Sequence, residues 1–338
     1  MPMNQLPRNI AAVMSLTGHT PLLEISYRFD GQPRTLFAKL ESMNMTGSIK
    51  DRMAAHILCE AYSSGALKPG DTIIEATSGN TGISFSAIGS ALGHKVRIFM
   101  PSWMSRERKD LITSFGAEVV DVSPEQGGFL GAIKMANDCV AQNDNIFLPH
   151  QFDNTANCDA HYGSTGPEIE RQLAAIGRLC DGFVAGVGTG GTVMGVGRYL
   201  RRSGRKVRVH PLEPSNSPTL STGHKVGKHR IQGISDEFIP SICKLNELDR
   251  VLDVWDGDAI LMAQMLSTKL GLGVGISSGA NILGAMRLVE ELGPKATVVT
   301  IMPDSNKKYL TTDLCRCEPD RDDYLTPRVE LECFSALR

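Results

Sequence analysis

Short apolar runs alternate with amphipathic stretches along most of the chain. The apolar runs have the length and β-branched character of buried strands. They are TLFAKL, TIIEAT, VRIFMP, EVVDV, NIFLPHQ, GFVAGVG, VRVHPLEP, RVLDVWD and TVVTIMPD. The stretches between them repeat their apolar positions at a helical period, as in DRMAAHILCEAYSSG and NILGAMRLVEELG. This alternation predicts an α/β fold, in which helical crossovers join parallel strands and cover both faces of a sheet.

The number of candidate strands bears on the domain organisation. Nine strands in 338 residues are many for one doubly wound sheet of ordinary size. We therefore expect two lobes, each built on a mostly parallel sheet with helices on its faces. Residues 315–338 differ in composition from the rest of the chain. They predict a C-terminal extension that packs on the body or on a partner subunit.

Composition and charge exclude several classes of function. A formal net charge of −2 and 6% aromatic residues leave no basic stripe for a nucleic acid. The N-terminus has no cationic segment followed by a continuous apolar one, and no later stretch is apolar enough to span a bilayer. We therefore expect a cytoplasmic protein without a membrane partner. The eight cysteines show no C-x-x-C pairing, which favours free thiols over a disulfide framework or a metal site.

The loop EATSGNTGIS at residues 75–84 follows a predicted strand and opens a predicted helix. Its centre is an unbroken run of glycine and polar residues: Thr77, Ser78, Gly79, Asn80 and Thr81. Free backbone N–H groups at a helix N-terminus, with hydroxyl donors beside them, suit a carboxylate or a phosphate. An ordinary N-cap would explain one hydroxyl residue but not the whole run. We therefore predict an anion-binding loop.

A second loop of this kind, GVGTGGTVMG, occupies residues 186–195. Its glycines match the dinucleotide fingerprint G-x-G-x-x-G, and Glu213 ends the next predicted strand, where a ribose-binding acid would be sought. The same run would also hold a single phosphate with its backbone N–H groups and the hydroxyls of Thr189 and Thr192. On this motif alone, an NAD-dependent dehydrogenase and a phosphate site are both open.

Lys50 lies in the segment MNMTGSIKDR, behind a run of small residues and just before a predicted helix. Most lysines lie on open surface and need no such setting. A lysine for a Schiff base, a phosphate cradle and an anion-binding loop are together the parts needed to hold pyridoxal 5'-phosphate. A nicotinamide site would leave Lys50 without a role, so the three segments together favour pyridoxal phosphate.

Five segments, in the right order, resemble the cysteine synthase and cystathionine β-synthase family of fold type II pyridoxal-phosphate enzymes. They are GSIKDR, EATSGNTGIS, GVGTGGT, KHRIQGIS and GISSGAN. The similarity extends from TGHTPLLEI to TIMPDSNKKYL, nearly the whole chain. It implies a two-lobed fold like that of the tryptophan synthase β subunit, and a homodimer. The smaller mobile lobe would comprise residues 45–154, and the larger cofactor-binding lobe residues 1–44 and 155–314.

The resemblance also implies roles for individual residues. Lys50 would form the Schiff base and then remove the α-proton of the substrate. Asn80 would hydrogen-bond the ring hydroxyl of the cofactor, and Ser277 would face the pyridine nitrogen. The implied phosphate cradle is Gly188, Thr189, Gly190, Gly191 and Thr192. The implied substrate-binding set is Thr77, Ser78, Gly79, Asn80, Thr81 and Gln151.

The implied reaction is a β-replacement or β-elimination on a serine- or cysteine-like amino acid, through an α-aminoacrylate. Asp236 departs from the family pattern, because GISDEFIP has an acidic pair where small residues are common. Asp236 either caps its loop or acts as general base for a neutral nucleophile. In the second case the enzyme would release hydrogen sulfide from cysteine and form serine or a thioether. A dehydrogenase and a catalytically inactive, protein-binding relative are the alternatives.

Overall fold

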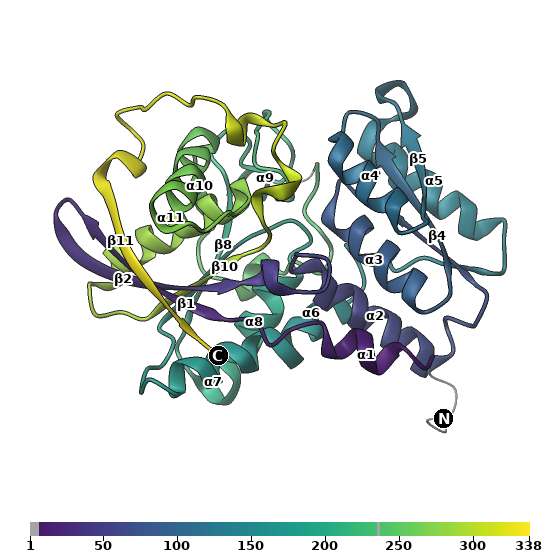
Figure 1. Ribbon diagram of the computed structural model, residues 1–338, viewed down its shortest axis with the longest axis horizontal. Helices are drawn as coiled ribbons and strands as arrows, with labels where there is room; N and C mark the ends of the chain where they lie inside the picture. Colours follow the sequence, from purple (N-terminus) through teal and green to yellow (C-terminus); the bar gives the residue numbers. More distant parts are fainter. Residues whose placement is uncertain (1–6, 235–236) are drawn as a thin grey trace.

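The computed structural model describes residues 7–234 and 237–338. It contains a seven-stranded and a four-stranded sheet, which lie side by side with helices packed on their faces (Figure 1). This arrangement confirms the predicted α/β class with two sheets. The proposed lobe boundaries at residues 45 and 154 stay a prediction.

The larger sheet has the strand order β11-β1-β2-β10-β7-β8-β9. Five neighbouring strands, β2, β10, β7, β8 and β9, are parallel. In contrast, β1 pairs antiparallel with both β2 and β11. The bounds are β1 (Leu22–Phe29), β2 (Gln32–Leu40), β7 (Gly182–Gly186), β8 (Arg208–Pro214), β9 (Leu252–Val254), β10 (Val298–Met302) and β11 (Val329–Leu337).

The smaller sheet is parallel throughout, in the order β5-β4-β3-β6. Its bounds are β3 (Thr72–Ala76), β4 (Lys95–Pro101), β5 (Glu118–Val122) and β6 (Ile146–Phe147). In the structure, β6 pairs with β3 only at Ile146 and Phe147. The strand predicted from NIFLPHQ is thus shorter than its apolar run.

Helices connect the strands and cover the sheets (Figure 1). The α-helices are α1 (Ile10–Ser15), α2 (Lys50–Ser64), α3 (Asn80–Ala91), α4 (Arg106–Ser114), α5 (Gly128–Ala141), α6 (Ala156–Ala160), α7 (Gly166–Ala174), α8 (Gly191–Arg201), α9 (Thr219–Thr222), α10 (Asp256–Leu270) and α11 (Ile276–Leu292). A π-helical turn, η4 (His161–Thr165), joins α6 to α7. Short 3-10 turns are η2 (Glu41–Met43), η3 (Pro124–Gln126), η5 (Arg202–Gly204), η6 (Leu245–Glu247), η7 (Asn306–Lys308), η8 (Asp313–Cys315) and η9 (Thr326–Arg328). Within the described ranges, none of the helices has the length and apolar character needed to cross a membrane.

Two strands were missed by the sequence analysis, β1 and β11. Their residues alternate between buried and more exposed positions over part of their length, so neither forms a continuous apolar run. This is the pattern of antiparallel strands near a sheet edge, where one face is covered and the other meets solvent. The C-terminal extension thus packs on the body, as an added edge strand (Figure 1, yellow).

Four hydrophobic clusters fill the space between the sheets and their helices. Two clusters cover the larger sheet, with α10 and α11 contributing to one and α8 to the other. The helices α2 and α3 contribute to one cluster of the smaller sheet, and α5 to the other. This packing orients the strands, and the loops after β3, β7 and β10 converge on one cavity. Loops after the carboxyl ends of parallel strands are the usual position for a ligand site in such folds.

Candidate active site

One cavity collects most of the residues that the sequence analysis selected. Its empty space, open mouth included, is about 790 Å³. The predicted residues that line it are Lys50, Thr77, Ser78, Gly79, Asn80, Thr81, Gln151, Gly188, Thr189, Thr192 and Ser277. Three loops that are far apart in the sequence therefore meet in space, as the combined interpretation of their motifs requires.

Lys50 is the first residue of α2 and is half-buried. The segment before it is anchored to the end of β10, because the N–H of Ile49 donates to the carbonyl of Pro303 at 2.9 Å. Ser48 forms an isolated β-bridge with Asp304, and its hydroxyl accepts from the N–H of Lys50 at 3.3 Å. The backbone that carries Lys50 is thus fastened to the larger sheet.

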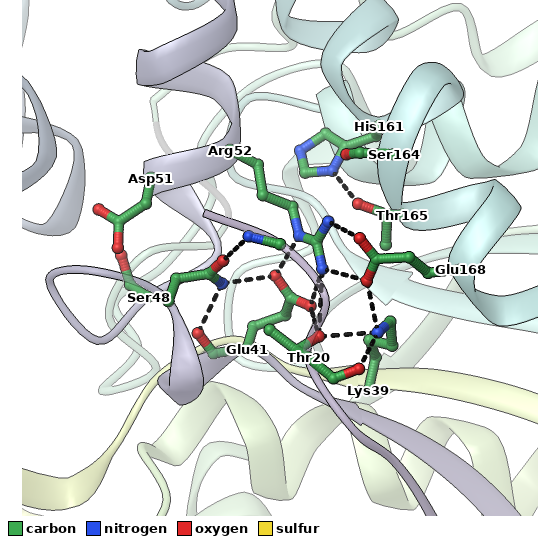
Figure 2. Close-up of polar contacts among 12 residues, drawn as sticks. Thr20, Lys39, Glu41, Ser48, Asp51, Arg52, His161, Ser164, Thr165 and Glu168 are labelled. Carbon is green, nitrogen blue, oxygen red and sulfur yellow. Dashed lines mark hydrogen bonds and ion pairs between the residues drawn. The ribbon is translucent and has the colours of Figure 1, made fainter. Parts of the chain in front are cut away.

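Two residues after Lys50 in α2, Arg52 belongs to a buried charge cluster of Lys39, Glu41, Arg52 and Glu168 (Figure 2). Arg52 donates to both carboxylates in a bidentate manner, at 2.6 and 2.8 Å to Glu41 and at 2.9 and 2.8 Å to Glu168. Lys39 Nζ lies 2.7 Å from Glu168. Two cations and two anions therefore compensate one another away from water, which is the condition for burying such groups.

The cluster holds its carboxylates ionised. Burial alone would raise the pKa of Glu41, but Arg52 and Lys39 outweigh it and lower the pKa to about 2. The pKa of Glu168 is lowered by Arg52 and Lys39 in the same way, against the effect of burial. Because these folded-state pKa values lie below the ordinary 4.5, the stabilisation is present above that value. It is lost as the pH falls from there through the folded-state values.

His161 makes a polar contact with the second glycine-rich loop. Its ring nitrogens lie 2.9 Å from the Thr165 hydroxyl and 3.3 Å from the Thr192 hydroxyl, so the ring links the π-helical turn to the glycine-rich loop. Burial, followed by the charges of Arg52 and Lys50, lowers the pKa of His161 to about 3. The imidazole is therefore neutral at physiological pH, and it orients the hydroxyl of Thr192.

The glycines of the second loop are required by close contacts. A Cβ at Gly188 would lie 2.4 Å from the carbonyl oxygen of Gly233, and one at Gly191 would lie 1.9 Å from Oδ1 of Asn157. Gly190 has a φ of 88°, in the left-handed region that favours glycine. Gly190 and Gly191 therefore set the backbone conformation of the loop. They are not among the residues that line the cavity. The N-terminus of α8 presents its N–H groups there, as a phosphate site requires.

Glu213 decides against the dinucleotide interpretation. Its carboxylate accepts from the N–H groups of Leu220 and Ser221 at 2.6 and 3.2 Å, and also from the hydroxyl of Ser221. Glu213 is buried, with 1% of its surface exposed. A carboxylate enclosed by its own chain is not available to bind a ribose hydroxyl.

Comparisons with known proteins agree with this geometry. The family model described as "Pyridoxal-phosphate dependent enzyme" matches residues 13–304. A probable cysteine synthase of Bacillus subtilis (strain 168) is 41% identical over 305 residues, which is 90% of this chain and 97% of the relative. The chain belongs to the pyridoxal-phosphate-dependent enzyme family.

Solved structures confirm both the fold type and the resemblance noted in the sequence. The crystal structure of a hydrogen sulfide-producing enzyme from Fusobacterium nucleatum superposes with a TM-score of 0.96 at 52% identity, covering 98% of this chain and 99% of that chain. A variant of that enzyme in complex with an α-aminoacrylate intermediate gives a TM-score of 0.94 at 53% identity, covering 96% and 97%. The cofactor of the family is pyridoxal phosphate, so the dehydrogenase alternative is wrong.

The residues present fit this cofactor. A helix N-terminus with crowded glycines and the hydroxyls of Thr189 and Thr192 offers donors for a phosphate. Lys50 supplies an amine on the same cavity, and Ser277, 5% exposed in the first turn of α11, supplies a hydroxyl. The donor set therefore matches a phosphorylated aldehyde with a ring nitrogen. The roles assigned to individual residues stay predictions.

In this pyridoxal-phosphate-dependent enzyme, Gln151 holds residues 77–81, which we call the substrate loop after their predicted role. The hydroxyl of Thr81 donates to Oε1 of Gln151 at 2.7 Å, and Nε2 of Gln151 donates to the carbonyl of Ala76 at 2.8 Å. Asn157 donates to both the carbonyl of Gln151 and the hydroxyl of Thr189 at 2.9 Å. The substrate loop and the phosphate cradle are thereby joined through two buried amides.

Sequence reasoning missed a set of residues from the end of β10 and from α4. Asn80 donates from Nδ2 to Asp304 at 2.7 Å and accepts at Oδ1 from Lys308 at 2.9 Å. Tyr309 donates to Asp304 at 2.5 Å and packs against Arg108, whose Cζ lies 4.9 Å from the ring centre. The amide of Asn80 is therefore held in place by side chains from the segment that follows β10.

Arg108 adds a buried positive charge to the wall of the cavity. It is 2% exposed, and a Cβ at Gly79 would lie 2.6 Å from its Nε. That Nε has no hydrogen-bond partner among the described residues. A sequence signal for Arg108 existed, because it lies four residues before Ile112 and shares the buried face of α4 with it.

Asp236 lies outside the described residues, so its prediction is not tested by the structure. The neighbouring Glu237 is described, and its carboxylate lies 2.9 Å from Nζ of Lys225. Glu237 therefore has a cation beside it.

Glu75 is a buried carboxyl that has no neighbouring cation among the described residues. It lies at the end of β3, behind the substrate loop, and accepts from the N–H groups of Ala76 and Gln151 at 2.9 and 3.2 Å. Burial raises the pKa of Glu75 to about 8, although these two N–H groups lower it. Glu75 is therefore largely protonated at neutral pH, in contrast to Glu41 in the charge cluster.

Arg52→Met tests the charge cluster. We expect a fall of about 3–5 kcal/mol in the free energy of unfolding, because two buried carboxylates lose their shared partner. Urea denaturation of wild type and variant at neutral pH measures the change. As a control, Arg34→Met removes the more exposed pair with Glu290, which should cost at most about 1 kcal/mol. Equal losses in the two variants would contradict the role assigned to the cluster.

Glu75→Gln tests the raised pKa. Above pH 4.5 the unfolded chain has lost the Glu75 proton while the folded chain keeps it, up to about pH 8. The wild type should therefore lose stability with rising pH in this window, by up to about 1.4 kcal/mol per pH unit relative to the variant. Urea midpoints at pH 5, 6, 7 and 8 give the two curves. Parallel curves for wild type, Glu75→Gln and the exposed control Glu330→Gln would refute the assignment.

Proposed function

We propose that this enzyme catalyses β-replacement on a serine- or cysteine-like amino acid, and that release of hydrogen sulfide from cysteine is its native direction. One observation carries the proposal: a single cavity unites the amine of Lys50, the glycine cradle and the anion-binding loop. The 52% identity to a hydrogen sulfide-producing enzyme and the 41% identity to a probable cysteine synthase support it.

The roles of the chain follow from the positions of its side chains. Bound pyridoxal phosphate supplies an electron-withdrawing ring that stabilises negative charge at the substrate α-carbon. Lys50 Nζ accepts the proton from that carbon. The N–H groups and hydroxyls of residues 77–81 bind the substrate carboxylate, and the buried charge of Arg108 favours an anion at this loop.

The net reaction requires a nucleophile as its second substrate. The C–S bond of cysteine breaks, sulfur leaves as hydrogen sulfide, and water adds to Cβ to form serine. A thiol that adds instead of water forms a thioether. Either nucleophile is neutral and must lose a proton, which Asp236 accepts as general base. The complex of an aspartate-to-asparagine variant of the Fusobacterium enzyme with an α-aminoacrylate intermediate supports an aspartate that acts late in the reaction.

The remaining predictions from the sequence belong to the same proposal. The enzyme is a cytoplasmic homodimer with small-molecule partners. Its smaller lobe, residues 45–154, moves against the larger one during turnover. The location of all four strands of the smaller sheet within this range supports the division.

Lys50→Ala tests the covalent attachment. We expect sulfide release from cysteine to fall by at least about a thousandfold, because the amine is both cofactor anchor and base. In wild type, borohydride reduction followed by peptide mass spectrometry should place the cofactor on Lys50. Lys308 is the internal control, since it lies beside Asn80 and burial lowers its pKa. A cofactor adduct on Lys308, or a normal rate in Lys50→Ala, would overturn the assignment.

Asp236→Asn tests the general base. The variant should still release the first equivalent of sulfide from cysteine, whereas formation of serine should slow by roughly a hundredfold or more, because a positioned base contributes about that much. Rapid-quench measurement of sulfide and serine separates the two steps. Glu237→Gln is the matched control and should leave serine formation unchanged. Equal rates of serine formation in wild type and Asp236→Asn would return Asp236 to a loop-capping role.

A further inference from the structure

The C-terminal segment folds back to the loop after α9, residues 223–234, whose last residues line the active site. Arg230, in that loop, donates to Glu318 in a bidentate manner, at 2.6 and 2.7 Å. The same guanidinium donates to Asp256 at 2.9 and 3.2 Å, and the N–H of Arg230 donates to Asp256 at 2.9 Å. We call Arg230, Asp256 and Glu318 the terminal clamp.

The segment that carries Glu318 is itself held firmly against α10. Asp258, in the first turn of this helix, accepts from the N–H groups of Leu325 and Thr326 at 2.8 and 2.9 Å. A Cβ at Gly257 would lie 2.2 Å from the hydroxyl of Tyr324 and 2.4 Å from Oε1 of Glu318, so the segment approaches the helix as closely as a glycine permits. Only 8% of the Glu318 side chain is exposed. Glu318 therefore has a fixed position relative to α10.

Arg230, the partner of Glu318 in the clamp, lies close in the sequence to residues that line the cavity. Gln232, Gly233 and Ile234 line the active site and begin two residues after Arg230. The carbonyl oxygen of Gly233 faces Gly188 so closely that a Cβ there would lie 2.4 Å from it. A shift of the backbone after Arg230 would thus move the cavity wall against the phosphate cradle.

The clamp joins the site to a part of the chain outside the matched family region. The family model ends at residue 304, whereas Glu318 lies beyond it. Arg230 and Glu318 are 88 positions apart in the sequence, so the contact exists only because the terminal segment folds back over α10. The charge-assisted, bidentate geometry is the stronger kind of hydrogen bond in proteins.

We propose that Glu318 is a positioning residue of the active site: through Arg230, it holds the wall formed by Gln232, Gly233 and Ile234 in the geometry that binds the amino-acid substrate. Glu318 does not touch the reacting atoms. The effect on substrate binding rests on the proposed function. The effect on the loop does not, because it concerns the order of the loop alone.

Glu318→Gln tests the proposal, because it keeps the size of the side chain and removes its charge. The loop contains exposed Lys225 and Lys228, at which trypsin cuts. In the holoenzyme, we expect cleavage at these lysines to become about tenfold faster in the variant, and KM for cysteine to rise about tenfold with kcat within about twofold of wild type. Glu332→Gln is the matched control: it removes another ion pair of the C-terminal segment, between Glu332 on β11 and Arg28 on β1.

A double substitution tests whether Glu318 acts through Arg230. If it does, Arg230→Gln and Arg230→Gln with Glu318→Gln should be cleaved at the same rate. Cleavage at the loop and KM both as in wild type would overturn the proposal. So would faster cleavage confined to Arg316 and Arg321, because Glu318 would then hold only its own segment. An enzyme without sulfide release but with loop cleavage accelerated in Glu318→Gln would refute the proposed function and leave the clamp supported.

Discussion

Arg52 binds Glu41 and Glu168 from the first turn of the helix that begins at Lys50. The two carboxylates come from the turn after β2 and from α7, so a single guanidinium ties three segments together. A buried charge costs free energy unless it is paired and hydrogen-bonded, and here all the groups are. The helix therefore has one strongly favoured position relative to the larger sheet, and that position directs Lys50 to the cavity.

The site around Lys50 depends on contacts of the same long-range kind. Asn157 joins Gln151 to Thr189, and so connects the substrate loop to the phosphate cradle. Asp304 and Lys308 hold the amide of Asn80 from the end of β10. Each loop is thus fixed by a side chain from another element. A ligand that contacts both loops finds them already in place, which reduces the ordering cost of binding.

Two buried glutamates show how the surroundings set protonation. Glu41 lies beside Arg52 and Lys39, which lower its pKa to about 2 despite its burial. Within residues 7–234 and 237–338, Glu75 accepts only from backbone N–H groups and has no neighbouring cation, so burial raises its pKa to about 8. One side chain therefore stays ionised and the other keeps its proton. Glu41 pairs electrostatically with Arg52, whereas Glu75 is a neutral hydrogen-bonding group behind the substrate loop.

The residue pattern alone indicates the α/β class, the glycine-rich and hydroxyl-rich loops, and the candidate lysine Lys50, because these depend on local periodicity and on the chemistry of contiguous residues. It did not reveal β1 and β11, since their alternating patterns acquire meaning only when a neighbouring strand covers one face. Nor did it reveal the pairing of Arg52 with Glu168, which lie 116 positions apart. Long-range packing encloses Glu213 within its own chain and brings Glu318 to Arg230. Such contacts depend on how distant segments pack, and no local pattern of residues specifies that.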